Sequence, residues 1–292
     1  KQKEIPMKKL TLTLILCMTA TFAAMAQSRI ITDTLSSKIL GKDVPFNVYL
    51  PVGFDKSEAR YPVVYLLHGL YGDHTDWANT GRLKLVADLL IASGEAVPMV
   101  ILMPCAGGED VHNVQNGYFN MPGCNYEDFF FQEFLPAAEK KYRCIGDKEH
   151  RAVMGLSMGG GGSTVYCQRH PEMFSSCYAM SAWLDLNEGD TRTDLSEDDK
   201  LYIVAKSVMD NSALKFIENA DEGTLARLKT VKWFFDCGDD DGLMTLSCRL
   251  HTMMARKGIR NELRVRDGAH TWEYWHTALY NSLPFASRNF AK

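Results

Sequence analysis

Short apolar runs alternate with longer amphipathic segments along most of the chain. The apolar runs are rich in β-branched and aromatic residues and are bounded by proline and glycine, which is typical of buried strands. They occupy residues 46–51, 61–69, 98–104, 151–155, 175–182, 231–238 and 261–268. Apolar residues at helical spacing lie between these runs, at 81–94, 125–142 and 242–257, after Ser157, and after His270. This alternation predicts an α/β fold, with a mostly parallel central sheet and helices on both faces.

One segment interrupts the alternation. Residues 184–229 contain the polar stretch "DLNEGDTRTDLSEDDK" and then a helical pattern. We interpret them as a small helical insertion over the strand ends, within a single domain that spans residues 27–292. In the helical segment 125–142, the internal Pro136 predicts a bend or a second helix start.

The first 26 residues have the pattern of a secretory signal peptide. Two lysines follow Met7, and an apolar run "LTLTLILCMTATFAAM" leads to a small-x-small site at "AMA". We expect residues 1–6 to lie upstream of the true start and cleavage to follow Ala26. The mature protein is then expected in the periplasm or outside the cell, without a stable membrane anchor. A retained anchor, or a lipid on Cys17, is the alternative.

Composition narrows the classes of partner. The 292 residues carry a net charge of −4 and the basic residues are scattered, so no basic stripe predicts binding to nucleic acid. Export permits disulfides, but seven cysteines follow Cys17, and an odd number leaves at least one unpaired. No C-x-x-C spacing indicates a zinc or redox site. Cys167 and Cys177 lie in apolar surroundings and are expected in the core.

A serine flanked by glycines is the first candidate for chemistry. The stretch "GLSMGG" at 155–160 follows a predicted strand and precedes a predicted helix. That context is what a G-x-S-x-G nucleophile elbow requires, with Gly155 and Gly159 small enough for strand and helix to approach closely. A glycine-rich surface loop is the alternative, but it does not explain the strand, turn and helix. We therefore predict that Ser157 is a nucleophile.

A serine nucleophile needs a base, which in this architecture follows the serine in the sequence and lies after a strand. Of eight histidines, only His270 directly follows a late strand, in "VRDGAHTWEYW". The others lie upstream of the serine, at helix ends or within helices: His68, His74, His112, His150, His170, His251 and His276. His270 is therefore the predicted base.

The orienting carboxylate is expected in the stretch "FFDCGDDDGL". Asp236 is still within the strand, so the candidates are Asp239, Asp240 and Asp241. The same cluster could be a calcium loop, but aligning an EF-hand on Gly242 places cysteines at its first and last ligand positions. We expect no metal at this motif. The residues alone do not choose among the three aspartates.

The chain resembles the α/β-hydrolase esterases grouped around feruloyl and acetyl-xylan esterases, which are related to S-formylglutathione hydrolase and the mycolyltransferases. The resemblance covers about residues 40–290 and rests on six motifs in order. They are "YLLHGLYGDHTDW", "ILMPCAGG", "NYEDFFFQEFLPAAEKKY", "RAVMGLSMGGGGS", "CGDDDGL" and "DGAHTWEYW". Two positions depart from the pattern: Cys105 stands where Asp or Asn is frequent, and Gly161 replaces a bulkier residue.

The resemblance implies a triad of Ser157, Asp241 and His270, with the backbone N–H groups of Leu70 and Met158 as oxyanion donors. It also implies a serine carboxylic ester hydrolase that uses an acyl-enzyme intermediate and needs no cofactor. The expected substrates are small-molecule or polysaccharide esters, with acyl or feruloyl groups on plant polysaccharide favoured. An acyltransferase, another serine hydrolase acting on peptide or lipid esters, and a non-catalytic carbohydrate-binding protein are the alternatives.

Four aromatic residues are candidates for substrate contacts. Trp272 follows the predicted base by two positions, Trp183 ends the strand after the elbow helix, and Tyr118 and Phe119 lie on the loop after the fourth strand. Ligands of open α/β sheets bind at the carboxyl ends of the strands, so these side chains are predicted to line a pocket there. The alternative is that two or more of them fill the core.

Overall fold

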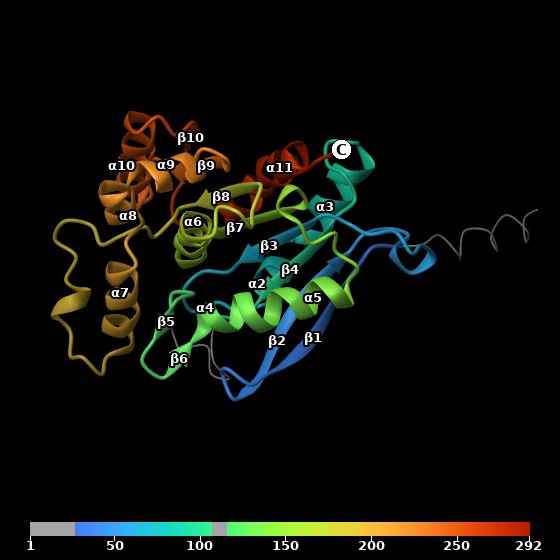
Figure 1. Cartoon of the computed structure of the whole chain (residues 1–292), viewed down its shortest axis with the longest axis horizontal. Coiled ribbons are helices and arrows are strands. Elements are labelled where there is room, and N and C mark those ends of the chain that lie inside the picture. The colour runs from blue at the N-terminus through green and yellow to red at the C-terminus, as the bar shows by residue number, and fades with distance from the viewer. Residues whose placement is uncertain (1–26, 107–115) are drawn as a thin grey trace, which may run out of the picture.

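The computed structural model describes residues 27–106 and 116–292, and its centre is a sheet of eight strands (Figure 1). Their order across the sheet is β1-β2-β4-β3-β7-β8-β9-β10. The strands are β1 (Arg29–Ser37), β2 (Lys42–Leu50), β3 (Val63–Leu67), β4 (Val100–Pro104), β7 (Arg151–Leu156), β8 (Ser176–Met180), β9 (Lys232–Gly238) and β10 (Asn261–Arg266). From β4 to β10 all neighbours pair in parallel, whereas β2 is antiparallel to both β1 and β4. The predicted mostly parallel α/β sheet is confirmed.

Helices cover both faces of this sheet and bury two apolar layers. Alternate residues of β3 point to opposite faces, so Val63 and Tyr65 belong to one layer and Val64 and Leu66 to the other. The first layer packs against α5 (Leu135–Lys141), α6 (Met158–Arg169), α8 (Ala213–Asn219) and α10 (Met244–Arg256). The second packs against α2 (Asp76–Asn79), α3 (Leu83–Ala92) and α11 (Trp272–Asn289), and α3 and α11 lie side by side.

The predicted helix 125–142 has a change of winding in place of a simple bend. It begins as α4 (Tyr126–Asp128), widens into a π-helical stretch η2 (Phe129–Phe134) and continues as α5. Pro136 lies in the first turn of α5, where its missing N–H costs no α-helical hydrogen bond. The wider turn brings Phe129, Phe130 and Phe134 all into the core.

Two small features escaped the sequence pattern. Strand β1 is an edge strand with one face packed against the protein and the other face in solvent. Its sequence "RIITDTLSS" therefore reads as polar. The hairpin of β5 (Asn120–Met121) and β6 (Cys124–Asn125) is too short to leave a periodic signal. Neither feature changes the arrangement of the strands that carry the predicted site.

The segment 184–229 between β8 and β9 holds the short helix η4 (Arg192–Asp194), α7 (Lys200–Asp210), α8 and α9 (Glu222–Leu228). In Figure 1, α7 and α8 form a column at one end of the molecule. The three longer helices start at Asp199, Ser212 and Asp221, whose side chains cap them by accepting backbone N–H groups. Their apolar sides join the first core layer, so these helices are anchored to the domain.

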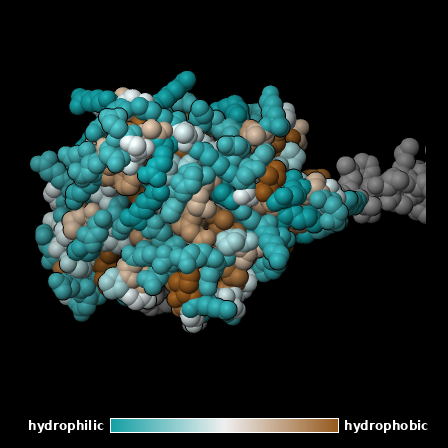
Figure 2. Space-filling view, in the orientation of Figure 1, coloured by the Kyte–Doolittle hydropathy of each residue, from teal (hydrophilic) through white to brown (hydrophobic). Residues whose placement is uncertain are grey.

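The outer surface is mainly polar. The face shown in Figure 2 is largely hydrophilic, with small and separate apolar patches. No helix in the described part of the chain is both long enough and apolar enough to cross a membrane. The predicted signal peptide, residues 1–26, lies outside the described residues. None of the seven cysteines at positions 105–248, all of them described, forms a disulfide, and Cys167 and Cys177 are buried as expected.

Candidate active site

Ser157 lies at the sharp turn between β7 and α6. Its φ of 53° and ψ of −117° are strained for a residue with a side chain, and the turn projects the hydroxyl above the sheet. A Cβ on Gly155 would lie 2.5 Å from the Gly159 carbonyl oxygen, and one on Gly159 would lie 2.5 Å from the His68 carbonyl oxygen. Both glycines therefore occupy places where only glycine fits, as the elbow motif predicts.

The glycine run after the serine has a packing reason as well. A Cβ on Gly161 would lie 2.2 Å from the backbone carbonyl oxygen of Trp183, and one on Gly160 would lie 2.8 Å from that of Met180. The first turns of α6 therefore lie directly against the backbone at the end of β8. This close contact accounts for glycine at position 161.

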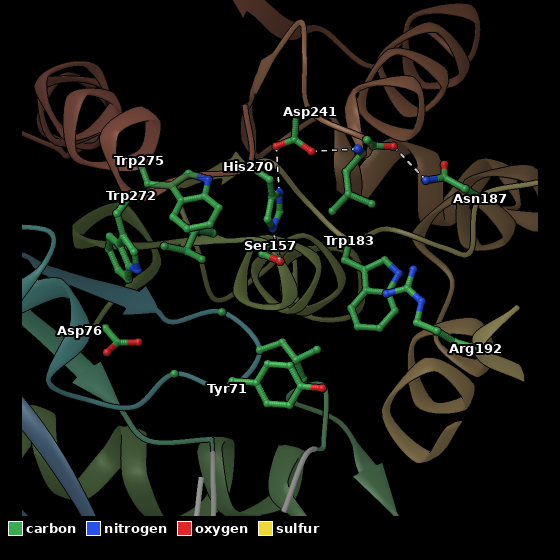
Figure 3. A pocket seen from close by; sticks show the side chains of 16 residues that line it. Tyr71, Asp76, Ser157, Trp183, Asn187, Arg192, Asp241, His270, Trp272 and Trp275 are labelled. Carbon is green, nitrogen blue, oxygen red and sulfur yellow. Dashed lines mark hydrogen bonds and ion pairs between the residues drawn. The ribbon is translucent and has the colours of Figure 1, made fainter. Parts of the chain in front are cut away.

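Ser157, His270 and Asp241 form one hydrogen-bonded line (Figure 3). The imidazole Nε2 of His270 lies 3.0 Å from Ser157 Oγ, and its Nδ1 lies 2.8 Å from Asp241 Oδ2. The three residues come from three different strand ends, after β7, β9 and β10. Asp241 is 5% exposed and Ser157 is 8% exposed, whereas more than a third of the His270 side chain is exposed. The imidazole can therefore reach both the serine and a substrate.

The carboxylate of Asp241 is held in its ionised form. Burial alone would raise its pKa, but hydrogen bonds from His270, the Leu243 N–H and the Ser181 hydroxyl outweigh burial and lower the pKa below its ordinary value. The Leu243 N–H donates to Oδ1 at 2.8 Å. Asp239 instead accepts the Gly268 N–H at 3.1 Å and is exposed. The geometry thus singles out Asp241 from the aspartates that the residues alone left open.

Ser181 and Trp275 surround this pair and were not found from the sequence. Ser181 directly follows β8, is fully buried and has a φ of 46°. Its hydroxyl accepts the indole N–H of Trp275 at 2.9 Å, and the Trp275 ring meets the His270 ring nearly at right angles, 4.8 Å between centroids. Ser181 and Trp275 therefore help to hold both triad partners of the serine, Asp241 and His270, in position. The left-handed Ser181 has no sequence signal, because serine rarely adopts that conformation.

The loop after β3 is set by a buried histidine. His68 accepts the Ala106 N–H at Nε2 (2.9 Å) and donates from Nδ1 to the Gly69 carbonyl oxygen (2.8 Å). Burial is the main cause that lowers the His68 pKa to about 4, so the ring is neutral near pH 7. Leu70 follows in the pocket wall, and Met158 is the first residue of α6. Their backbone N–H groups remain the predicted oxyanion donors.

A pocket of about 670 Å³ opens over Ser157. This volume is in the range of ligand sites for small molecules. Trp183 and Trp272 are in its wall, as predicted, together with Tyr71, Asp76 and Arg192. In Figure 3 Asp76 and Trp272 lie on one side of Ser157, and Trp183 and Arg192 lie on the other.

The structure does not place Tyr118 and Phe119 in this pocket, which corrects that part of the prediction. Tyr118 is 0% exposed and Phe119 is 2% exposed. The Tyr118 hydroxyl donates to the His68 carbonyl oxygen at 2.9 Å, and its ring packs against Gly162 and Tyr126. Gly162 leaves space that Tyr118 fills, so the aromatic side chain supports the site from beneath.

Three acidic residues outside the triad gather on the surface. Carboxylate oxygens of Asp239, Asp240 and Asp267 lie within 4.8 Å of one another, and all three residues are exposed. Exposed carboxylates without further ligands do not make a metal site, so this cluster carries no assignment. Hydrolysis by a serine, a histidine and an aspartate requires no metal or organic cofactor.

Comparison with known proteins places this geometry in a family. The esterase family model, described as "Putative esterase", matches residues 37–286. The chain belongs to this esterase family. The resemblance drawn from the six motifs and the predicted enzyme class, a serine carboxylic ester hydrolase, are both confirmed.

Individual relatives agree. A solved ferulic acid esterase is 50% identical, with a TM-score of 0.87, and the match covers 91% of this chain and 100% of that one. The endo-1,4-beta-xylanase/feruloyl esterase of Xylanibacter ruminicola is 29% identical over 251 residues, 84% of this chain. The chain spans only 30% of that relative's length. An S-formylglutathione hydrolase of Staphylococcus aureus is 17% identical, with a TM-score of 0.72 and coverage of 90% and 100%, which shows the shared fold.

Proposed function

We propose that the protein is an exported esterase that removes acyl or feruloyl groups from plant polysaccharide through an acyl-enzyme intermediate. The hydrogen-bonded line from Asp241 through His270 to Ser157, at the base of an open pocket, carries the proposal. The substrate class is supported by the ferulic acid esterase at 50% identity, and by the feruloyl esterase named in the Xylanibacter relative.

In the first half of the proposed reaction, Ser157 Oγ attacks the ester carbonyl carbon. His270 Nε2, 3.0 Å away, takes the hydroxyl proton, and Asp241 stabilises the imidazolium that forms. The carbonyl oxygen becomes an oxyanion that accepts the N–H groups of Leu70 and Met158. Loss of one such donor typically slows the reaction by about a hundredfold or more. His270 then gives its proton to the alcohol oxygen as the carbon–oxygen bond breaks.

In the second half, water repeats the attack on the acyl-enzyme. His270 takes a proton from the water, whose oxygen bonds to the acyl carbon, and Ser157 leaves with the proton that the imidazole returns. The free acid and the original enzyme are the products. More than a third of the His270 side chain is exposed, so water can reach the imidazole from the pocket.

Export is part of the proposal because a polysaccharide is too large to cross a cell membrane intact. The basic, apolar and small-residue segments of residues 7–26 support it. Fractionation of cells that express the whole chain, followed by N-terminal sequencing of the mature protein, tests this part. We expect activity outside the cytoplasm and a new terminus at Gln27.

A screen of purified protein on methyl ferulate, acetylated xylan and aryl acetates tests the proposed substrate class. We expect hydrolysis of all three ester types in wild type and of none in Ser157→Ala, with methyl ferulate or acetylated xylan turned over at higher kcat/KM than aryl acetates. Turnover of aryl acetates alone would contradict the polysaccharide assignment. Transfer of the acyl group to an added sugar, in place of release to water, would make the protein an acyltransferase.

A further inference from the structure

One wall of the pocket contains Trp183, which directly precedes the segment 184–229. The indole of Trp183 has no hydrogen-bond partner among the described residues. The backbone N–H of Trp183 donates to the Ser157 carbonyl oxygen at 2.9 Å, which fixes Trp183 next to the nucleophile. Its side chain is 3% exposed, and its Nε1 atom is buried with no acceptor in residues 27–106 and 116–292. An unsatisfied buried donor costs free energy, so it calls for an explanation.

A guanidinium lies on the same indole. Arg192 Cζ is 4.2 Å from the centre of the Trp183 ring, and both residues line the pocket. Asp190 accepts from Arg192 Nε at 2.9 Å and also binds Nη2, so the pair is close to neutral. A guanidinium has five N–H donors, and this pairing leaves those on Nη1 for another acceptor. This end of the pocket therefore presents N–H donors without a net charge.

The opposite end of the pocket presents a hydrogen-bond acceptor in place of donors. Asp76 is a half-buried carboxylate that lines the pocket, and Figure 3 shows it across Ser157 from Arg192. A carboxylate accepts hydrogen bonds, which suits hydroxyl groups that donate. The Trp183 and Arg192 end suits groups that only accept, and a methoxy oxygen is such a group. A second carboxylate fits poorly there because Asp190 already neutralises the guanidinium.

We propose that the Trp183 indole N–H and the Arg192 guanidinium bind a ring oxygen of an aromatic acyl group, the methoxy oxygen of a methoxylated hydroxycinnamoyl ester. This inference rests on the proposed function and adds the residues that distinguish an oxygenated ring from a bare one. A site built to hydrogen-bond a substrate group discriminates against the analogue that lacks the group, because its own polar atoms are then left unpaired.

The test compares kcat/KM for methyl ferulate with that for methyl cinnamate, which has the same acyl chain and no ring oxygen. Wild type should prefer the ferulate by about tenfold or more. Trp183→Phe keeps an aromatic ring and removes the N–H, and Arg192→Gln removes the charge and most of the donors. Each should lower the preference about three- to tenfold, mainly through the ferulate value.

Trp233→Phe is the matched control. The Trp233 indole N–H donates to the Leu228 carbonyl oxygen within the core, away from the pocket, so the preference should stay at the wild-type value. If Trp183→Phe does not fold, as judged by circular dichroism, Arg192→Gln decides, because Arg192 is a partly exposed residue at the start of the short helix η4.

Two failures can be told apart. If wild type hydrolyses ferulate and cinnamate equally, or if Arg192→Gln leaves the preference unchanged, the subsite is overturned and the esterase remains. If wild type hydrolyses neither ester but does hydrolyse aryl acetates, the proposed substrate class fails and the subsite fails with it.

Discussion

Asp241 lies 2.8 Å from the Nδ1 atom of His270, whereas its neighbours Asp239 and Asp240 are exposed on the surface. Asp241→Asn should therefore lower kcat by about a thousandfold or more, through loss of the correct imidazole tautomer and of charge stabilisation. The same change at Asp239 or Asp240 should cost less than about threefold. Steady-state kinetics on an aryl acetate measures all three variants. A severe loss at Asp240 with a mild one at Asp241 would show that the orienting acid is misassigned.

Ser181 links the triad acid to Trp275, so its removal should disturb the geometry of the site without preventing binding. Ser181→Ala takes a hydrogen bond from Asp241 and leaves the buried Trp275 N–H without an acceptor. We expect kcat to fall about tenfold while KM changes less than twofold, as for a residue that acts through another. Ser163→Ala is the control, because the Ser163 hydroxyl bonds only within α6, to the Gly160 carbonyl oxygen. Equal effects of both variants on kcat would argue against the role of Ser181.

His68 should make the folded protein sensitive to mild acid. Its pKa is lowered to about 4 in the folded state, whereas an unfolded histidine has a pKa near 6.5. Between these values the unfolded chain binds the proton and the folded protein does not. The contribution of neutral His68 to the free energy of unfolding is therefore complete above about pH 6.5. It is lost as the pH falls toward 4, by about 3 kcal/mol in total.

Urea unfolding of wild type and His68→Gln at pH 7 and pH 4.5 measures this dependence. Gln does not titrate, so the wild-type free energy of unfolding should fall more steeply with pH than that of the variant. Parallel pH dependences would mean that His68 is protonated in the folded protein, against the two hydrogen bonds that fix its neutral form.

Gly161 lies too close to Trp183 for any side chain. Gly161→Ala places a Cβ against a backbone carbonyl that cannot move aside as a flexible side chain does, and should lower the free energy of unfolding by about 1–3 kcal/mol. Gly223→Ala is the control, since Gly223 lies in the exposed helix α9 with its nearest atom 3.7 Å from the added Cβ. That substitution should be neutral or stabilising because alanine favours helices. Thermal unfolding of both variants decides the matter.

The sequence alone predicted those strands and site residues whose local pattern matches their place in the fold. The central strands β3, β4, β7, β8 and β9 are buried on both faces, so their apolar runs are continuous. The elbow glycines and the histidine after β10 mark positions that the chemistry itself requires. The choice among three adjacent aspartates was different. It depends on which carboxylate reaches the imidazole of His270, and only the resemblance and the structure provide that information.

The aromatic residues show why substrate contacts were harder to predict. Trp183, Trp272, Tyr118 and Phe119 all lie near the strand ends, but residue 162 is a glycine and leaves a space beneath the site that Tyr118 fills. Burial in that space depends on packing between distant segments, which residue type does not reveal. Ser181 escaped notice for a related reason, since its role comes from a backbone conformation and a partner 94 positions away.

Ser157 as the nucleophile is the central claim, and turnover of an aryl acetate by Ser157→Ala tests it most directly. The hydroxyl is the atom that forms the acyl-enzyme, and the triad acts as a unit, so kcat should fall by at least about a thousandfold. The melting temperature should stay close to that of wild type, because the substitution removes one hydroxyl group, whose hydrogen bond is to His270. A variant that is folded and keeps more than about a tenth of wild-type kcat would contradict the account.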